Sequence, residues 1–255
     1  MGYNKIYSGG SSFSCAGGLN WSEVQNLYST LHDIKINNHI EYAYPNLISK
    51  KNNVSIVNDS IPGGSANRMI RKTFDYIHNH QSESKTTLFL LEIPPMWRDE
   101  FYSNDFDKMF NITWGVLKNS DDNTDVANGY DKSESLLIKN DLRDYFSKFI
   151  NVDFEIKKTM NNILGLLSYL KLNNIQYVLL NGFEFYTFLL KNNLKLDYNF
   201  YWIDGSIEPI NISFINKNLT ITHELNDIYT DNHLGYFGNE YVANNLNEFI
   251  KKTIK

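Results

Sequence analysis

Residues 86–93 read Thr-Thr-Leu-Phe-Leu-Leu-Glu-Ile and are followed at once by two prolines. A short apolar run that ends at such a break is typical of a strand buried on both faces of a sheet. Three other short segments also have the character of strands: 4–7, 54–57 and 175–180. Because these segments are nearly all apolar rather than alternating, they predict a mostly parallel sheet that is covered on both faces.

Apolar residues recur at helical spacing in the intervals between these strands. The pattern predicts helices over about 21–31, 66–78, 154–172, 183–191 and 240–254. Strands that alternate with helices favour a three-layer α/β/α sandwich, with a sheet of about five strands and a flavodoxin-like outline. In such a sheet the ligand site lies beyond the carboxyl ends of the strands, so the loops that follow the strands are the candidate site segments.

Residues from about 103 to 145 differ from the rest of the chain. They contain polar, turn-forming stretches such as 119–123 and 128–130. We therefore expect a single domain over residues 1–255, with an insertion at about 103–145 that contains one or two short helices.

The charge and hydropathy of the chain exclude several classes of protein. Its 255 residues include 24 Lys and Arg against 29 Asp and Glu, a formal charge of −5. A mildly acidic chain without a long basic run lacks the electrostatic footprint of a nucleic-acid-binding protein. The mean hydropathy is −0.40, and no apolar run reaches the roughly 18 residues that span a bilayer. We therefore expect a soluble, cytoplasmic protein without a cleavable signal peptide, and neither a nucleic-acid nor a membrane partner.

The sequence predicts no metal and no organic cofactor. The single cysteine, Cys15, rules out an internal disulfide framework and a cysteine-rich zinc site. Asp121, Asn123 and Asp125 have the spacing of a calcium loop, but such a loop needs glycine at the sixth position, where this chain has Val126.

The loop after the first expected strand reads Gly10-Ser11-Ser12-Phe13-Ser14. A serine at a strand-to-helix turn presents its hydroxyl at the edge of the sheet, next to the outward-pointing backbone N–H groups of the turn. This arrangement combines a nucleophile with donors for an oxyanion. The alternative interpretation is a serine-rich turn that only caps a helix.

A second candidate segment lies just before the last expected helix, where residues 231–238 read Asp-Asn-His-Leu-Gly-Tyr-Phe-Gly. A histidine in a loop, oriented by a nearby carboxylate, is the general base that a serine nucleophile requires. Here Asp231 would orient His233 and stabilise its imidazolium form. The alternative interpretation is a polar loop with an incidental histidine.

Together the two segments resemble the SGNH, or GDSL-like, hydrolases. The first block of that family reads Gly-Asp-Ser-Leu/Phe-Ser/Thr after the first strand, and residues 10–14 read Gly-Ser-Ser-Phe-Ser. The last block is Asp-x-x-His or Asp-x-His, often followed by Pro-Gly, and here Leu234 stands in place of the proline. The resemblance implies that Ser12 is the nucleophile, His233 the general base and then acid, and Asp231 the residue that orients His233.

The second block of the family is an Asn at the end of the second strand, followed five residues later by a Gly. Asn58 and Gly63 match this spacing, and Ser65 occupies a small hydroxyl position. The resemblance implies that the oxyanion hole contains the N–H groups of Ser12 and Gly63, or of Gly64 if the register differs by one. Residues 63–71 also resemble this block in poorly characterised members, several of them viral, which makes a viral origin one expectation.

The third block departs from the family pattern. The family has Gly-x-Asn-Asp after the third strand, and the Asn side chain is the third oxyanion donor, but this chain has Pro94 at that position. Loss of one donor typically costs about 3–4 kcal/mol of transition-state stabilisation. Either Asn67 or Arg98 fills the gap as a donor or substrate contact, or the hole has two donors only. The alternative for Arg98 is an ion pair with a carboxylate such as Asp99 or Glu100.

The resemblance implies a serine ester hydrolase that acts through an acyl-enzyme without metal or cofactor. By analogy with the family, the expected substrate is a short acyl group, such as acetyl, on a carbohydrate or similar small ester. The competing hypothesis is a non-catalytic protein of the same fold that binds glycan or serves in an assembly, which the proline at position 94 favours. Four aromatic residues near the site edge and the insertion either stack on sugar rings or belong to the core: Trp97, Tyr102, Trp114 and Tyr130.

Overall fold

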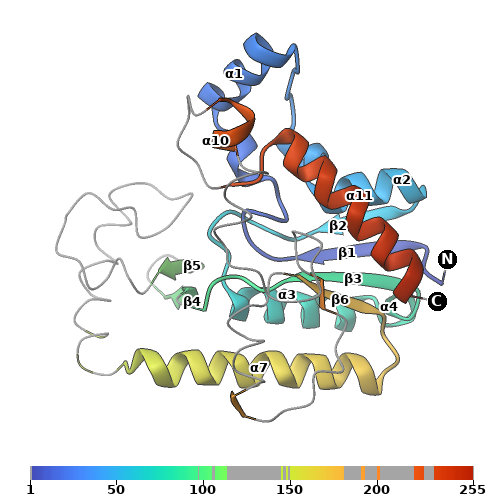
Figure 1. Cartoon of the computed structure of the whole chain (residues 1–255). Helices are drawn as coiled ribbons and strands as arrows, with labels where there is room; N and C mark the ends of the chain where they lie inside the picture. Colours follow the sequence, from blue (N-terminus) through green and yellow to red (C-terminus); the bar gives the residue numbers. More distant parts are fainter. Residues whose placement is uncertain are drawn as a thin grey trace.

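The computed structural model of the chain describes residues 2–96, 98–104, 107–113, 145, 148, 150–180, 191–192, 200–201, 221–226 and 233–254. Its main feature is a five-stranded sheet in which all neighbouring strands are parallel (Figure 1). In spatial order the strands are β2 (Ser55–Asn58), β1 (Lys5–Gly9), β3 (Thr87–Glu92), β6 (Tyr177–Leu180) and β7 (Phe200–Tyr201). The apolar run at 86–93 therefore forms the central strand, as its burial pattern requires.

The central strand β3 supplies side chains to both faces of the sheet. Leu88 and Leu90 pack with α2 (Tyr44–Asn52) and α11 (Tyr236–Thr253) on one face. Phe89 and Leu91 point to the other face and pack with α3 (Ala66–Asn79) and α7 (Val152–Leu172). Successive residues of a strand alternate between faces, so a strand that is apolar throughout needs a helical layer on each side. Figure 1 shows these two layers, and they confirm the predicted α/β/α sandwich.

Two of the helices, α3 and α7, begin where the sequence supplies a capping side chain. Ser65 accepts a hydrogen bond from the Arg68 N–H at the start of α3, and Asn151 accepts one from the Phe154 N–H at the start of α7. Four of the five predicted helices are confirmed to within a few residues: α1 (Ser22–His32), α3, α7 and α11. The predicted helix at 183–191 lies outside the described residues except for its last position.

A third apolar cluster joins segments that are far apart in the sequence. It combines α1 with η1 (Gly17–Asn20), η2 (His39–Tyr42) and α10 (Ile221–Glu224), and its buried members include Leu19, Tyr28 and Leu225. Figure 1 shows α1 and α10 beside each other, beyond one end of the sheet. The segment that follows the loop at residues 10–14 is thereby packed against the segment that precedes the loop of His233.

The described residues at the start of the predicted insertion belong to a β-hairpin, and the short helices expected within the insertion stay a prediction. β4 (Arg98–Ser103) pairs antiparallel with β5 (Lys108–Thr113), and the rest of the insertion up to residue 144 lies outside the described residues. Three α-helices of the structure were not predicted from the sequence: α2, α10 and the four-residue α4 (Gln81–Ser84). In α2 the buried residues are few and include a serine and a proline, so the apolar periodicity is weak.

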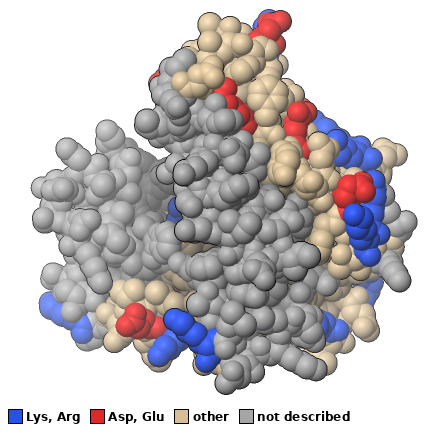
Figure 2. All heavy atoms as spheres, in the orientation of Figure 1, with Lys and Arg blue, Asp and Glu red and all other residues tan. Residues whose placement is uncertain are grey.

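Basic and acidic side chains are interspersed on the face drawn in Figure 2, in keeping with nearly balanced totals of 24 and 29. Among the described residues, no helix is both long enough and apolar enough to cross a membrane.

Candidate active site

Ser12 lies in a tight turn directly after β1, and only 4% of its surface is exposed. The Gly17 N–H donates a hydrogen bond to the Ser12 carbonyl at 2.7 Å, which closes the turn. A Cβ atom on Gly17 would lie 2.9 Å from the Ser12 Cβ, so glycine is the residue that fits this position. Ala16, the residue before it, adopts a left-handed conformation with φ of 53°.

His233 faces the serine from the other end of the chain. Its Nε2 lies 2.8 Å from Ser12 Oγ, although 221 residues separate the two in the sequence. The imidazole is bracketed by the rings of Phe13, at 5.8 Å, and Trp21, at 5.9 Å between centroids. The predicted pairing of these two side chains is therefore present. Asp231, the predicted third member, lies outside the described residues.

The second-block loop places a free backbone donor near the serine loop. Residues 61–64 form a turn in which the Gly64 N–H donates to the Ile61 carbonyl at 3.1 Å and Gly63 has φ of 70°. Proline followed by a glycine with positive φ is typical of a type II turn. Within the described part of the chain, neither the Gly63 N–H nor the Ser12 N–H donates a hydrogen bond.

The Gly64 N–H, the alternative oxyanion donor, is engaged in closing the turn, whereas the Gly63 N–H is not. Gly64 instead allows the two loops to meet: a Cβ there would lie 2.7 Å from the Gly10 carbonyl oxygen. Asn58, at the end of β2, ties the same loops together. Its amide group donates to the Ser14 carbonyl at 2.9 Å, and its side-chain oxygen accepts from the Ser60 N–H.

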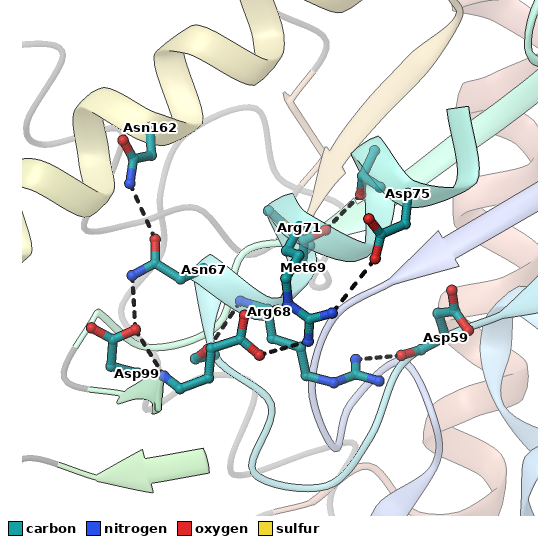
Figure 3. A network of polar contacts seen from close by, with 11 residues as sticks. Asp59, Asn67, Arg68, Met69, Arg71, Asp75, Asp99 and Asn162 are labelled. Atoms are coloured by element: carbon teal, nitrogen blue, oxygen red, sulfur yellow. Dashed lines mark hydrogen bonds and ion pairs between the residues drawn. The ribbon is translucent and has the colours of Figure 1, made fainter. Parts of the chain in front are cut away.

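Pro94 follows β3 in a buried position and offers no N–H, as the sequence predicts. Asn67 does not replace the missing donor. Its side-chain nitrogen donates to Asp99 Oδ1 at 2.8 Å and makes a longer contact of 3.4 Å with Thr159 Oγ1. Its oxygen accepts from Asn162 at 3.3 Å, so the Asn67 amide links α3 to β4 and α7 (Figure 3). This corrects the prediction that Asn67 contacts the substrate.

Arg98 is half-buried at the start of β4, and the predicted alternative of an ion pair with Asp99 or Glu100 is wrong. Glu100 is held by Arg71, through two bonds of 2.8 Å, and Asp99 by Asn67. Within the described part of the chain, the Arg98 guanidinium has no hydrogen bond or ion pair. Burial lowers the pKa of Arg98, and the nearby charge of Glu92 opposes that shift.

Sequence reasoning missed two carboxylates, one buried and one partly buried, that contact the loops or helix starts next to Ser12 and His233. Glu92, the last residue of β3, is 1% exposed and accepts hydrogen bonds from Ser11 and Ser14. Glu224, the last residue of α10, accepts from the N–H groups of Phe237 and Gly238 at the start of α11. The first could have been noticed as the one charged residue inside the apolar run at 86–93.

Cys15 is buried near the nucleophile loop, but it is not positioned as a nucleophile. Burial, and after it the charge of Glu92, raise the pKa of its thiol to about 12, so the thiol stays protonated at neutral pH. Among the described residues, no group of three or more His, Cys, Asp or Glu side chains could hold a metal ion.

No protein-family model matches the chain, and no curated protein matches it. Its fold is similar to several solved structures. These include the psychrotrophic esterase EstA from Pseudoalteromonas sp., with 14% identity, a TM-score of 0.45, and coverage of 98% of this chain and 97% of that chain. A putative lipolytic protein of the G-D-S-L family from Desulfitobacterium hafniense has 9% identity, a TM-score of 0.44, and coverage of 96% and 99%.

A putative acylhydrolase from Bacteroides fragilis has 11% identity and a TM-score of 0.41, and the match covers 99% of this chain and 88% of that chain. All three TM-scores lie below 0.5. The residues of this chain, not the names of those proteins, therefore carry the functional proposal.

Proposed function

We propose that this protein is a serine ester hydrolase of the SGNH type that acts through an acyl-enzyme. The observation that carries the proposal is the 2.8 Å approach of His233 Nε2 to Ser12 Oγ, beside two unpaired backbone N–H groups. A nucleophile, a base within hydrogen-bond reach and oxyanion donors are the three groups that acyl transfer requires. These groups come from loops that follow β1 and β2 and precede α11, which is the edge where α/β sheets bind ligands.

In the proposed reaction Ser12 Oγ attacks the ester carbonyl and its proton passes to His233 Nε2. The N–H groups of Ser12 and Gly63 stabilise the oxyanion of the tetrahedral intermediate. The intermediate collapses to the acyl-enzyme, and His233 returns the proton to the departing alcohol. Water then attacks the acyl-enzyme with His233 as base, and the acid leaves as Ser12 regains its proton. No step needs a metal or an organic cofactor.

Two further roles belong to the proposal. Asp231, two residues before His233, orients the imidazole and stabilises its protonated form. Arg98 is the proposed substrate contact or third donor, since it is a half-buried cation without a described partner. An unpaired guanidinium is costly to bury, and an oxyanion or polar substrate group would offset that cost.

We further propose that the substrate is a short acyl ester, such as an acetyl ester, of a carbohydrate. The support is Trp21, whose ring meets the catalytic imidazole edge-on while 40% of the residue stays exposed. An exposed aromatic ring beside the reacting atoms offers a flat surface on which the C–H face of a sugar ring can stack. Of the aromatic residues considered earlier, Tyr102 is exposed on β4, and Trp97, Trp114 and Tyr130 lie outside the described residues.

One observation favours a second candidate, a non-catalytic protein of the same fold that binds glycan or serves in an assembly. Pro94 removes the third donor, and a hole with two backbone donors forfeits about 3–4 kcal/mol of transition-state stabilisation unless Arg98 compensates.

A fluorophosphonate probe distinguishes the two candidates. We expect it to label the wild type and not Ser12→Ala, and we expect turnover of short p-nitrophenyl esters by the wild type alone. If no serine is labelled and ester turnover stays at background, the hydrolase proposal fails. Kinetics of the wild type and Trp21→Ala on a panel of acetylated sugars then test the proposed substrate. Loss of the Trp21 ring should raise KM for sugar esters more than for p-nitrophenyl acetate.

A further inference from the structure

Glu92 holds the backbone on both sides of the nucleophile. Its Oε2 accepts the Ser11 N–H at 3.0 Å and the Ser14 N–H at 2.9 Å, and its Oε1 accepts the Ser11 hydroxyl at 2.5 Å. The fit is close, since a Cβ on Gly10 would lie 2.7 Å from both Glu92 Cβ and Glu92 Oε2. Ser12 itself makes no bond to Glu92, so its N–H remains available for an oxyanion.

Glu224 holds the loop that carries the histidine. Its carboxylate accepts the N–H groups of Phe237 at 3.1 Å and Gly238 at 2.5 Å, which are orphan donors at the start of α11. The Tyr28 hydroxyl donates to the same carboxylate at 2.5 Å. At the other end of α10, the Ile221 N–H donates to the His233 carbonyl at 3.0 Å. The helix α10 is thus tied both to His233 and to the first turn of α11.

We propose that Glu92 and Glu224 are positioning residues, which together set the Ser12–His233 distance by fixing the backbone of the two loops. The proposal rests on the hydrolase function given above. Each carboxylate accepts at least two backbone N–H groups within a few residues of a catalytic side chain, and neither touches the reacting atoms in the described structure.

The chemistry of the contacts explains why a carboxylate stands at each position. An ionised carboxylate accepts hydrogen bonds with both oxygens, whereas an amide presents one acceptor and one donor. With Leu at position 92, the three donors of Ser11 and Ser14 would lose their acceptor. Gln could still serve them, because its oxygen can accept both N–H groups while its nitrogen donates to the Ser11 hydroxyl. With Gln at position 224, the side-chain N–H₂ would face the N–H of Phe237 or Gly238. A buried donor without an acceptor is costly, so the loop would shift to find one. A shift of about 1 Å in a catalytic group can cost about 10²-fold in rate.

The sequence around Glu92 supports the same interpretation. Where the family block has Gly-Asp-Ser, this chain has Ser11 before the nucleophile, and the Ser11 hydroxyl lies 2.5 Å from a Glu92 oxygen. The loop has therefore no carboxylate of its own, and a carboxylate from the end of β3 occupies the adjacent space. An exchange of the two side chains, Ser11→Asp with Glu92→Ser, would return the carboxylate to the loop.

The test compares Glu92→Leu and Glu224→Gln with the wild type and with Glu248→Gln. Glu248 is an exposed residue of α11 that pairs with Lys251, so its variant controls for removal of a carboxylate. We expect each test variant to lose about 10- to 100-fold in kcat and in fluorophosphonate labelling rate, with KM nearly unchanged, because positioning acts on the transition state. The Ser11→Asp/Glu92→Ser exchange should recover much of the rate lost in Glu92→Leu.

Amide hydrogen exchange provides a readout that does not depend on activity. We expect the amides of Ser11 and Ser14 to exchange faster in Glu92→Leu, and those of Phe237 and Gly238 in Glu224→Gln, with no change in Glu248→Gln. Exchange at wild-type rates in both test variants would overturn the proposal, as would full kcat with faster exchange. If the wild type is inactive but the variants show the expected exchange, the hydrolase function is rejected. The role of Glu92 and Glu224 in fixing the backbone would then still hold.

If Glu92→Leu fails to fold, Ser11→Ala tests the same carboxylate with a smaller change. It keeps the carboxylate and its two backbone bonds but removes the hydroxyl bond. We expect a smaller loss of kcat and a smaller fall in melting temperature than in Glu92→Leu, because one buried carboxylate oxygen loses its hydrogen-bond donor. Full kcat and unchanged exchange at Ser14 in this variant would count against the role of Glu92.

Discussion

At the scale of single residues, two glycines decide how closely the backbone packs around Ser12. Gly64 touches the Gly10 carbonyl, and Gly17 touches Ser12, so both positions exclude a side chain. These contacts set the places of the two backbone donors that the proposed mechanism uses, Ser12 N–H and Gly63 N–H. Backbone atoms cannot move aside as a flexible side chain can, which makes these glycines sensitive points.

Gly64→Ala is expected to push the second-block loop away from the nucleophile loop. Its Cβ would lie 2.7 Å from one carbonyl oxygen and 3.2 Å from another. We expect a loss of about 1–3 kcal/mol in the free energy of unfolding, as for overpacked sites, and a larger proportional loss of acylation rate. Urea denaturation and fluorophosphonate labelling measure the two effects.

Gly165→Ala is the matched control, because a Cβ there has no neighbour within 4 Å and the residue is exposed within α7. It should stabilise the protein by about 0.5–1 kcal/mol through helix propensity. Equal stability effects at the two glycines would contradict the close approach at Gly64.

At the scale of elements, polar contacts join the β4–β5 hairpin to α3. Asp99 on β4 accepts from Asn67, and Glu100 pairs with Arg71, which also reaches Asp75 (Figure 3). Arg68, on the same helix, donates to the Asp59 carbonyl at 2.6 Å. The first turns of α3 therefore hold the hairpin on one side and the loop after β2 on the other.

Asp99 gives this contact a defined pH dependence. Burial raises the pKa of its carboxyl above the ordinary 3.8, against the hydrogen bonds from Asn67 and the Glu100 N–H. A raised pKa in the folded state means that the folded protein holds the proton more tightly than the unfolded chain. The stability that Asp99 contributes is thus fully present below its ordinary pKa and is lost as pH rises through the raised value.

Asp99→Asn removes that loss while its side-chain oxygen can still accept both hydrogen bonds. We expect the melting temperature of the variant, relative to wild type, to increase as pH rises from about 4 and then to level off. Asp75→Asn, an exposed carboxylate on α3, controls for the loss of a negative charge. If the melting temperatures of Asp99→Asn and wild type differ by the same amount at every pH, the Asp99 carboxyl has the same pKa in the folded and unfolded states, which contradicts the prediction.

The whole molecule is a sheet between two helical layers, and each layer has its own apolar cluster. Ile163 of α7 belongs to one cluster and Leu246 of α11 to the other, and both are completely buried. Because β3 contributes to both clusters, we expect the two layers to unfold together. The single-domain organisation over residues 1–255 remains a prediction that this cooperativity tests.

Ile163→Ala and Leu246→Ala are each expected to reduce the free energy of unfolding by about 2–5 kcal/mol. Both should shift one and the same unfolding transition, followed by circular dichroism and by tryptophan fluorescence. Leu172→Ala, whose side chain is 83% exposed, should change stability by less than about 0.5 kcal/mol. Two separable transitions, each moved by one variant, would contradict a single cooperative domain.

The sequence by itself determined the layered α/β/α fold, four of its helices and the identity of Ser12 and His233 as candidates. These features are local: apolar runs, helical periodicity and short motifs are legible in neighbouring residues. The sequence also showed that Pro94 cannot donate, because that property belongs to the residue type alone.

Only the tertiary structure decided which groups meet. It paired Ser12 with His233 across 221 residues, engaged the Gly64 N–H in a turn, and turned Asn67 toward Asp99. It also revealed Glu92 and Glu224 as acceptors for backbone N–H groups near Ser12 and His233. Such contacts depend on which strand ends and helix starts lie at the same edge of the sheet. The number of residues between two side chains in the sequence does not determine their distance in the folded protein.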